Sequence, residues 1–293
     1  MTQLSQHQIE TFHRDGCITI ENAVSTAQLE GMRAAFDRWV DDSRAHQKPY
    51  GEQADGRPRF DLEPGHTAER PGLRRVASPT ELDGVFLDVL TRSAMITMLQ
   101  DLIGPDLRLH HSKLNSKLPG TATTVKWHQD FTYDPHSNDD VVTCLVFLDD
   151  VTEANGPLRI VPGSHKGPLY SLRQNGRFTG AIADEFTADL DSRAIPQMGK
   201  AGSACLMHSR VLHASSANAS DQPRTLFIAE IAAADAMPLT PNPLPSRHAG
   251  LLLAGSEPGR IRATSFEMEM PEIPTGASFF DQQASTTQDA TAQ

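Results

Sequence analysis

The N-terminal segment carries a helical pattern, a short extended run and a second helical pattern. Ser5 is a typical N-cap for a short helix through Phe12, and Gly16 ends this helix before an expected strand at residues 17–20. Ser25 caps a longer helix, because apolar residues recur after it at helical spacing. The apolar face of that helix comprises Leu29, Met32, Phe36 and Val40.

A further helical stripe starts after Ser78 and Pro79 and stops at Gly104 and Pro105. Its apolar positions are Val85, Leu87, Leu90, Ile96, Leu99 and Ile103. Residues 41–77, which precede it, are polar and rich in glycine, proline and charge. They predict an extended loop region.

From about residue 106 the pattern changes to short β-branched or alternating runs separated by turn-rich segments. These runs cover residues 107–118, 141–148, 158–161, 203–207 and 225–232. Helices followed by many short strands predict an α+β protein built around a sandwich or barrel.

The length of 293 residues suits one domain over residues 1–281 with a β core at about 106–232. Residues 233–281 form a C-terminal extension, in which the four prolines of residues 238–250 indicate a loop or lid over the core. The polar tail at residues 282–293 is expected to be disordered.

Composition limits the classes of partner that we expect for this chain. A net charge of −11 argues against nucleic acid or an anionic membrane surface as the main partner, so a small-molecule substrate is expected for a monomer or homodimer. Neither a signal peptide nor an apolar run long enough for a bilayer is evident. Cys17, Cys144 and Cys205 have no CxxC spacing, which fits a reducing cytoplasm.

One candidate metal motif is His128-Gln129-Asp130, which follows a strand-like run at residues 123–127. Residues i and i+2 of a strand point to the same side, so an imidazole and a carboxylate project together. A second histidine from a distant strand would complete the two-His-one-carboxylate face that binds Fe(II) and leaves positions open for O2 and a co-substrate.

The spacing alone is weak evidence, because His13 and Asp15 repeat it at a helix end that is expected to face water. The distant partner must also be chosen among twelve histidines. His110 and His111 are adjacent on a strand, so at most one is expected to face inward.

His213 is the best partner because Arg224 follows it at the start of an apolar strand (224 − 213 = 11). A buried guanidinium needs an anion, and a carboxylate bound in bidentate fashion is its best match. The alternative is that Arg224 pairs with one of the protein's own carboxylates.

Three motifs together resemble the phytanoyl-CoA dioxygenase family of Fe(II)/2-oxoglutarate oxygenases. They are the His128-to-Asp130 motif, residues 156–165 (GPLRIVPGSH) and His213-Ala-Ser with Arg224. The resemblance runs from the N-terminal helices to about Ile231, and residues 112–117 and 155–158 are similar to ectoine hydroxylases. It implies a double-stranded β-helix, a jelly-roll and cupin-like core with the N-terminal helices packed on one sheet.

The resemblance also implies roles for individual residues. His128, Asp130 and His213 would bind iron, Arg224 would hold the distal carboxylate of 2-oxoglutarate, and further co-substrate contacts would come from Ser215, Asn115, Thr143 and Lys113. Asn115 and Thr143 are equally compatible with ordinary strand polarity, and Lys117 is expected to be a solvated charge at a strand end.

The implied reaction is hydroxylation of a C–H bond of a small, polar metabolite by Fe(II), 2-oxoglutarate and O2, with release of succinate and CO2. The carboxylate of Asp130 disfavours halogenation, and residues 131–136 depart from the ectoine hydroxylase pattern. Candidate substrate contacts are Gln129, Tyr133, Arg159, residues 59–63 and the pair Arg74 and Arg75, although a surface arginine pair is more often solvated.

Two other classes of function remain open. A zinc hydrolase or lyase can use two histidines and a carboxylate, but this class leaves Arg224 and Ser215 without a role. A non-catalytic barrel that binds a small acid would use Arg224, but it leaves the complete metal triad unexplained.

Overall fold

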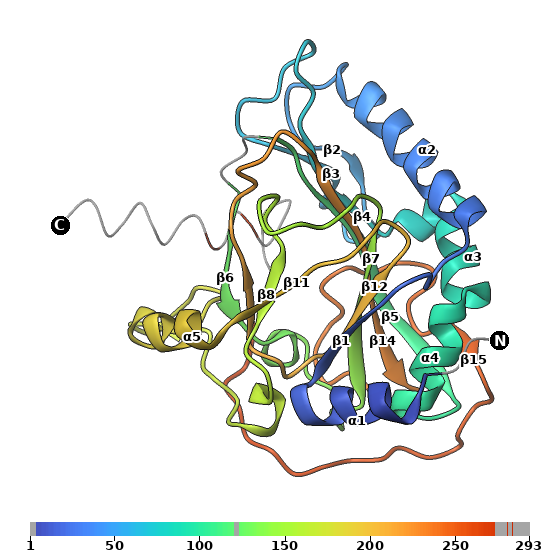
Figure 1. The fold of residues 1–293 in the computed structure, drawn as a ribbon, viewed down its shortest axis with the longest axis vertical. Coiled ribbons are helices and arrows are strands. Elements are labelled where there is room, and N and C mark those ends of the chain that lie inside the picture. The colour runs from blue at the N-terminus through green and yellow to red at the C-terminus, as the bar shows by residue number, and fades with distance from the viewer. Residues whose placement is uncertain (1–3, 120–122, 273–279, 281–282, 284–293) are drawn as a thin grey trace.

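The computed structural model describes residues 4–119, 123–272, 280 and 283. Figure 1 shows two β-sheets, with α2, α3 and α4 running along the outer side of the larger one. The chain therefore combines helices with a large antiparallel sheet, as the pattern of apolar positions predicted. The predicted disordered tail at residues 282–293 lies outside the described residues, apart from Gln283.

The large sheet has nine strands in the described part of the chain, and its neighbouring strands pair antiparallel. In spatial order the strands are β1 (Cys17–Ile20), β12 (Ala204–His208), β7 (Val141–Phe147), β14 (Arg224–Ala233), β5 (Leu107–Lys117), β4 (Leu73–Ala77), β3 (Pro58–Leu62) and β2 (Tyr50–Glu52), while β15 (Leu252–Ala254) also pairs with β5.

The small sheet faces the large one and has the order β11 (Ile195–Gln197), β8 (Leu158–Ile160), β13 (His213–Ser215) and β6 (Val125–His128). A separate hairpin pairs β9 (Arg173–Gln174) with β10 (Arg177–Phe178). The α-helices are α1 (Gln6–Asp15), α2 (Thr26–Ser43), α3 (Gly84–Arg92), α4 (Ala94–Ile103) and α5 (Thr187–Arg193). The described helices include none that is long and apolar enough to cross a bilayer.

Strand β7 explains why the core has two layers. All seven of its residues are buried, because each of its faces is covered. Val142, Cys144 and Val146 face the layer beneath the N-terminal helices. Leu145 and Phe147 face the layer between the two sheets. Alternation along a strand covered on both faces thus produces a continuous apolar run.

The first two helices begin where the sequence predicts. Ser5 and Ser25 each form a capping box, in which the serine hydroxyl accepts from the backbone N–H three residues later and a glutamine side chain bonds back. Gly16 adopts a left-handed conformation (φ 81°) that ends α1. These local signals require no tertiary information, so the sequence contains them in full.

Two predictions about the segment before β5 were wrong. Residues 41–77 are not a loop region, because β2, β3 and β4 lie there and extend the large sheet. Their charged residues obscured the strands, yet Asp61 and Arg74 form a buried ion pair of 2.6 Å between β3 and β4. The helical stripe that follows is also broken, since Ser93 is extended (ψ 162°) and separates α3 from α4.

The strands predicted from residue 107 onward are confirmed within one or two residues at each end. They correspond to β5, β7, β8, β12 and β14. All ten residues of β14 are buried, and this strand pairs with both β5 and β7. It therefore forms the centre of the large sheet and carries residues to the cavity described below.

Packing of the helices on the large sheet depends on Phe227 of β14. Its ring is fully buried and meets Phe86 of α3 edge-to-face, with 5.0 Å between the ring centroids. We expect Phe227→Ala to lower the free energy of unfolding by about 3–5 kcal/mol, because the substitution leaves a cavity in a close-packed layer. Chemical denaturation measures this loss. Phe186→Ala, at a ring that is 41% exposed, is the control, and an equal loss in both variants would contradict this account.

Candidate metal centre

The paired ends of two strands bring the predicted metal motif together. His128 ends β6, His213 starts β13, and the two residues are direct partners in the antiparallel register. Asp130 begins the short 3-10 turn Asp130–Thr132 directly after β6. The Nε2 atoms of His128 and His213 lie 3.5 Å and 3.6 Å from Oδ1 of Asp130. The three donor atoms thus converge on one point, as a shared ion requires.

Hydrogen bonds to the backbone orient both imidazoles. Nδ1 of His128 lies 2.8 Å from the carbonyl oxygen of Lys126, and Nδ1 of His213 lies 3.0 Å from that of Val211. A carbonyl can only accept, so both Nδ1 atoms carry the proton and both Nε2 atoms present a lone pair. The hydroxyl of Thr143 on β7 donates to Oδ2 of Asp130 over 2.6 Å, which leaves Oδ1 toward the histidines.

The charges of these groups suit a divalent cation. Burial and, to a smaller degree, the neighbouring His128 lower the pKa of His213 to about 4, so this imidazole is neutral at neutral pH. Burial would raise the pKa of Asp130, but His213, His128 and Lys113 outweigh burial, and the pKa lies well below its usual range. One carboxylate and two imidazoles fit Fe(II).

The second His-x-Asp copy behaves differently. The side chain of His13 is exposed near the end of α1, and Asp15 pairs with the neighbouring Arg14 at 2.6 Å. Equal spacing in the sequence therefore produces a converging site only where a strand end and a partner strand supply the third group.

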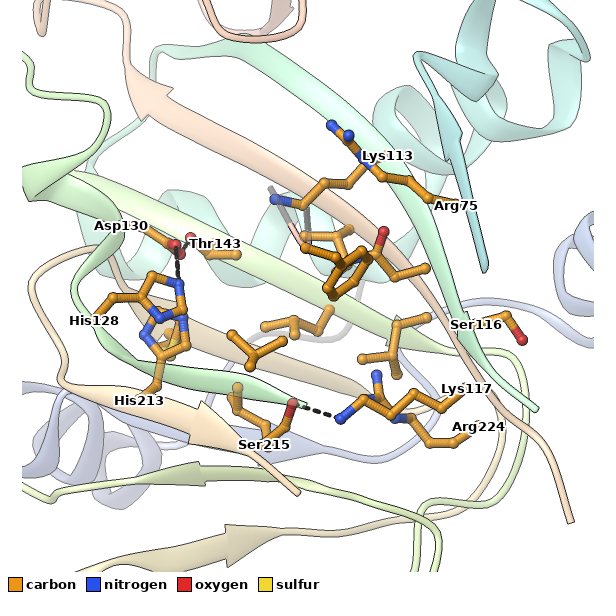
Figure 2. Close-up of a pocket in the computed structure, with 18 residues that line it drawn as sticks. Arg75, Lys113, Ser116, Lys117, His128, Asp130, Thr143, His213, Ser215 and Arg224 are labelled. Atoms are coloured by element: carbon orange, nitrogen blue, oxygen red, sulfur yellow. Dashed lines mark hydrogen bonds and ion pairs between the residues drawn. The ribbon is translucent and has the colours of Figure 1, made fainter. Parts of the chain in front are cut away.

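A cavity extends from this centre between the two sheets (Figure 2). Its walls include apolar residues of the inter-sheet layer, such as Leu145 and Leu226. The predicted co-substrate residues all line it: Lys113, Asn115, Thr143, Ser215 and Arg224. The structure thus brings together the whole predicted set, with the metal motif toward one end and Arg224 toward the other.

Arg224 occupies a buried position at the start of β14. Burial lowers the pKa of its guanidinium to about 10. Among the described residues, Arg224 forms no ion pair with a carboxylate, and its Nε atom has no hydrogen-bond partner. The alternative of an internal carboxylate partner is therefore not supported. A small anion in the cavity would supply the negative charge that this buried guanidinium lacks.

Lys117 corrects the expectation of a solvated strand-end charge. Its side chain is buried, and its register partner across β5 and β14 is Arg224. Its ammonium donates to Oγ of Ser215 over 2.8 Å and to the carbonyl oxygen of Ser216. Burial and the nearby Arg224 lower the pKa of Lys117 to about 6, partly opposed by Glu63. The far end of the cavity thus has two basic side chains instead of one.

Two of the predicted substrate contacts, Gln129 and Arg159, lie elsewhere. Gln129 is fully buried between the two ligands, but strand alternation turns it away from the cavity, and its amide donates to the carbonyl of Arg210 over 2.8 Å. Arg159 also lies outside the cavity lining, because it faces outward from β8 and pairs with Asp191 at 2.9 Å. Both side chains therefore stabilise the scaffold.

Tyr133 does line a second cavity on the other side of the metal motif. His128 and Asp130 form part of its wall, so the two cavities share the metal centre. The remaining lining residues are Arg57, Arg75, His111, Lys113, Asp134, Glu230, Pro243 and Leu244. Sequence reasoning missed most of them, although Arg75 was considered as one of a surface pair and is in fact buried.

The comparisons with known proteins agree with this geometry. The family model of phytanoyl-CoA dioxygenase (PhyH) matches residues 12–226. The chain belongs to the phytanoyl-CoA dioxygenase family. The resemblance carried by the three motifs is thereby confirmed, and so are iron and 2-oxoglutarate as the cofactor and co-substrate of this dioxygenase class.

Relatives within and near this family act on different small molecules. A probable alpha-ketoglutarate-dependent hypophosphite dioxygenase of Stutzerimonas stutzeri is 40% identical over 187 residues, which span 61% of this chain and 63% of that protein. The L-proline trans-4-hydroxylase of Streptomyces griseoviridis is 26% identical over 237 residues, which cover 74% and 82% of the two chains. The crystal structure of EctD from S. alaskensis with 2-oxoglutarate and 5-hydroxyectoine is 23% identical, covers 89% and 87%, and has a TM-score of 0.62.

Removing one imidazole should abolish the metal site of this PhyH-family chain. We expect His128→Ala or His213→Ala to lose measurable Fe(II) binding, because two remaining donors hold the ion poorly. Anaerobic calorimetry of the metal-free protein measures the affinity. His13→Ala is the matched control, since it removes the exposed histidine of the other His-x-Asp copy. Unchanged affinity in both site variants would place the ion elsewhere.

Proposed function

We propose that this chain is an Fe(II)- and 2-oxoglutarate-dependent hydroxylase of a small, polar, anionic metabolite, which releases succinate and CO2. The observation that carries the proposal is one cavity lined by the three metal-binding side chains toward one end and by two buried basic side chains, Arg224 and Lys117, toward the other. A dicarboxylate with a keto group matches that distribution of charge. We further propose that the two facing sheets form the double-stranded β-helix core implied by the family.

The residues of this chain have distinct tasks in the proposal. Arg224, Lys117 and Ser215 bind the distal carboxylate, and burial strengthens these bonds by excluding water. Thr143 and the backbone carbonyls fix the orientation of the metal ligands. When bound, the iron supplies the oxidising chemistry with O2 and the 2-oxo acid, while the protein positions the reacting groups.

The second cavity supports an anionic substrate. Its wall holds charged groups of both signs: Arg57, Arg75 and Lys113 could pair with an anionic group, Asp130, Asp134 and Glu230 are available to metal ions, and Tyr133 adds a hydroxyl. The names of two relatives agree with a substrate that presents a negatively charged group, since hypophosphite is an anion and proline, although a zwitterion, carries a carboxylate. Pro243 and Leu244 belong to the proline-rich segment 238–250 and line the same cavity, so that segment acts as its cover.

A zinc hydrolase remains the second candidate class for a site of two histidines and a carboxylate. It gives no role to the two basic side chains at the far end of the cavity. Lys113 is a buried basic group that lines both cavities, and burial and the neighbouring Arg75 keep its pKa below the usual value, although Asp130 and Glu230 oppose this. Dependence of turnover on Fe(II) and 2-oxoglutarate separates the two classes.

Succinate release tests the proposed reaction without knowledge of the substrate. We expect slow, uncoupled release from the purified protein that requires both Fe(II) and 2-oxoglutarate, and no release with Zn(II). Arg224→Ala should raise the KM for 2-oxoglutarate about 100-fold with a smaller change in kcat, because it removes a buried charge-assisted contact made in the ground state.

Arg159→Ala is the control for that variant, since Arg159 is paired with Asp191 outside the cavity. A chain that releases no succinate under any of these conditions would contradict the proposed reaction. An unchanged KM in Arg224→Ala would contradict only the role of this arginine.

Binding of 2-oxoglutarate should weaken as the pH rises. The pKa of Lys117 is about 6, so the ammonium that attracts the carboxylate is present below about pH 6 and is lost above it. Binding at higher pH then requires uptake of a proton, which costs up to about tenfold in affinity for each pH unit. Burial is the main cause of this low pKa; the neighbouring Arg224 lowers the pKa further and Glu63 raises it.

Calorimetry with Mn(II) in place of iron, from pH 6 to pH 8 and in two buffers, measures both affinity and proton uptake. We expect Lys117→Met to bind more weakly at pH 6 and to lose the uptake. Lys200→Met, at an exposed lysine that pairs with Asp150, should match the wild type. Equal proton uptake in Lys117→Met and the wild type would exclude Lys117 as the group that titrates.

A further inference from the structure

Four metal-ligating side chains meet beside the iron motif but are not part of it. His110 and His111 lie on β5, Glu230 on β14 and Asp134 shortly after β6. All four side chains are buried, with exposed fractions of 6%, 5%, 3% and 2%. Their nearest donor atoms lie within 4.8 Å of one another. We refer to these residues below as the quartet.

A β-bulge makes the quartet possible. Glu230 is the register partner of His111, whereas the next residue of β14, Ile231, pairs with Leu109 and thus skips His110. The extra residue breaks the alternation of side chains, so both adjacent histidines reach Asp134. The expectation that at most one of them faces inward was therefore wrong, because sequence periodicity contains no information about the bulge.

The polar atoms of the quartet lack the hydrogen bonds that burial normally demands. Nε2 of His110 lies 2.7 Å from Oδ2 of Asp134, and Nδ1 of His111 lies 3.3 Å from the same oxygen. Yet within the described residues these nitrogens, both oxygens of Asp134 and Oε1 of Glu230 have no hydrogen-bond partner of acceptable geometry. A buried polar group that nothing satisfies destabilises the folded protein.

We propose that the quartet is a second metal site, for a divalent transition-metal ion of the zinc class. Two imidazoles and two carboxylates are a common donor set for such ions, and two carboxylates balance the charge of a dication. The site needs no residue of the iron motif. It is a site separate from the proposed iron centre.

The spacing favours a metal ion over an organic ammonium group. Donor atoms around a tetrahedral ion with bonds of about 2.1 Å lie about 3.4 Å apart. Acceptors around an ammonium lie at about 2.8 Å from the nitrogen, so they are about 4.6 Å apart. The contact of 3.3 Å between His111 and Asp134 resembles the 3.5 Å between His128 and Asp130 in the iron motif, whereas the 2.7 Å between His110 and Asp134 is a hydrogen-bond distance that would have to lengthen when an ion binds.

Electrostatics supports the same conclusion. Burial and the charges of Asp134 and Asp130 raise the pKa of Glu230 well above its usual range, and Lys113 offsets this only in part. Carboxylates this close destabilise each other when nothing lies between them. A dication would remove that repulsion, since it attracts both.

The location of the quartet points to a role for the second ion in substrate binding. His111, Asp134 and Glu230 line the second cavity together with His128 and Asp130. An ion bound there would hold an anionic group of the substrate beside the iron. This use depends on the proposed hydroxylase function, whereas the existence of the site does not.

Zinc stoichiometry tests the site directly. The protein is stripped with a chelator, incubated with Zn(II), desalted and analysed by mass spectrometry of the metal. We expect about two equivalents for the wild type, about one for His128→Ala or for Glu230→Gln, and about none for the double variant His128→Ala/Glu230→Gln. Glu63→Gln, at a buried glutamate bonded to Thr123, should match the wild type.

The inference is overturned if His128→Ala binds no zinc, or if adding Glu230→Gln to it changes nothing. Circular dichroism checks the fold of each variant, and Asp134→Asn replaces Glu230→Gln if the latter does not fold. The visible spectrum of Co(II) in His128→Ala, which reports coordination by the quartet alone, should be lost in the double variant. Loss of the second equivalent with intact succinate release would leave the proposed function standing.

Discussion

Pairing between β6 and β13 is the constraint on which the site depends. It sets His128 directly opposite His213, and both strands are short, so a shift of register by one residue would turn one imidazole out of the site. The carbonyls that hold the two Nδ1 protons belong to residues just before these strand positions. Backbone geometry, more than side-chain packing, therefore fixes the metal ligands.

The rest of the molecule makes this arrangement stable in a charged interior. Charged groups line the inter-sheet space, including Arg224, Lys117, Asp130 and Arg75. Their burial opposes folding, and the apolar layer beneath the helices must compensate for it. The cavity residues remain ready for ligands because the helices on the opposite face of the large sheet provide much of the apolar burial.

Sequence reasoning recovered what local signals and ordered motifs contain. The helix caps at Ser5 and Ser25, the strands after residue 107 and the convergence of His128, Asp130 and His213 all follow from short-range patterns or from the spacing of motifs. It failed for β3 and β4, because their charged residues suggested solvent although Asp61 and Arg74 pair with each other in the interior and Arg75 lines both cavities. It also failed for Lys117 and Gln129, whose surroundings come from residues distant in sequence.

Strand β14 has a consequence for how this family can diverge. Arg224, Leu226, Ile228 and Glu230 lie at alternate positions, and all four reach one or the other cavity. An insertion or deletion of one residue in this stretch would rotate every position beyond it to the helix-covered face. Evolution can therefore change the substrate of such a protein by exchanging side chains along β14, but not by altering the length of the strand. Loops such as residues 238–250 carry no such restriction.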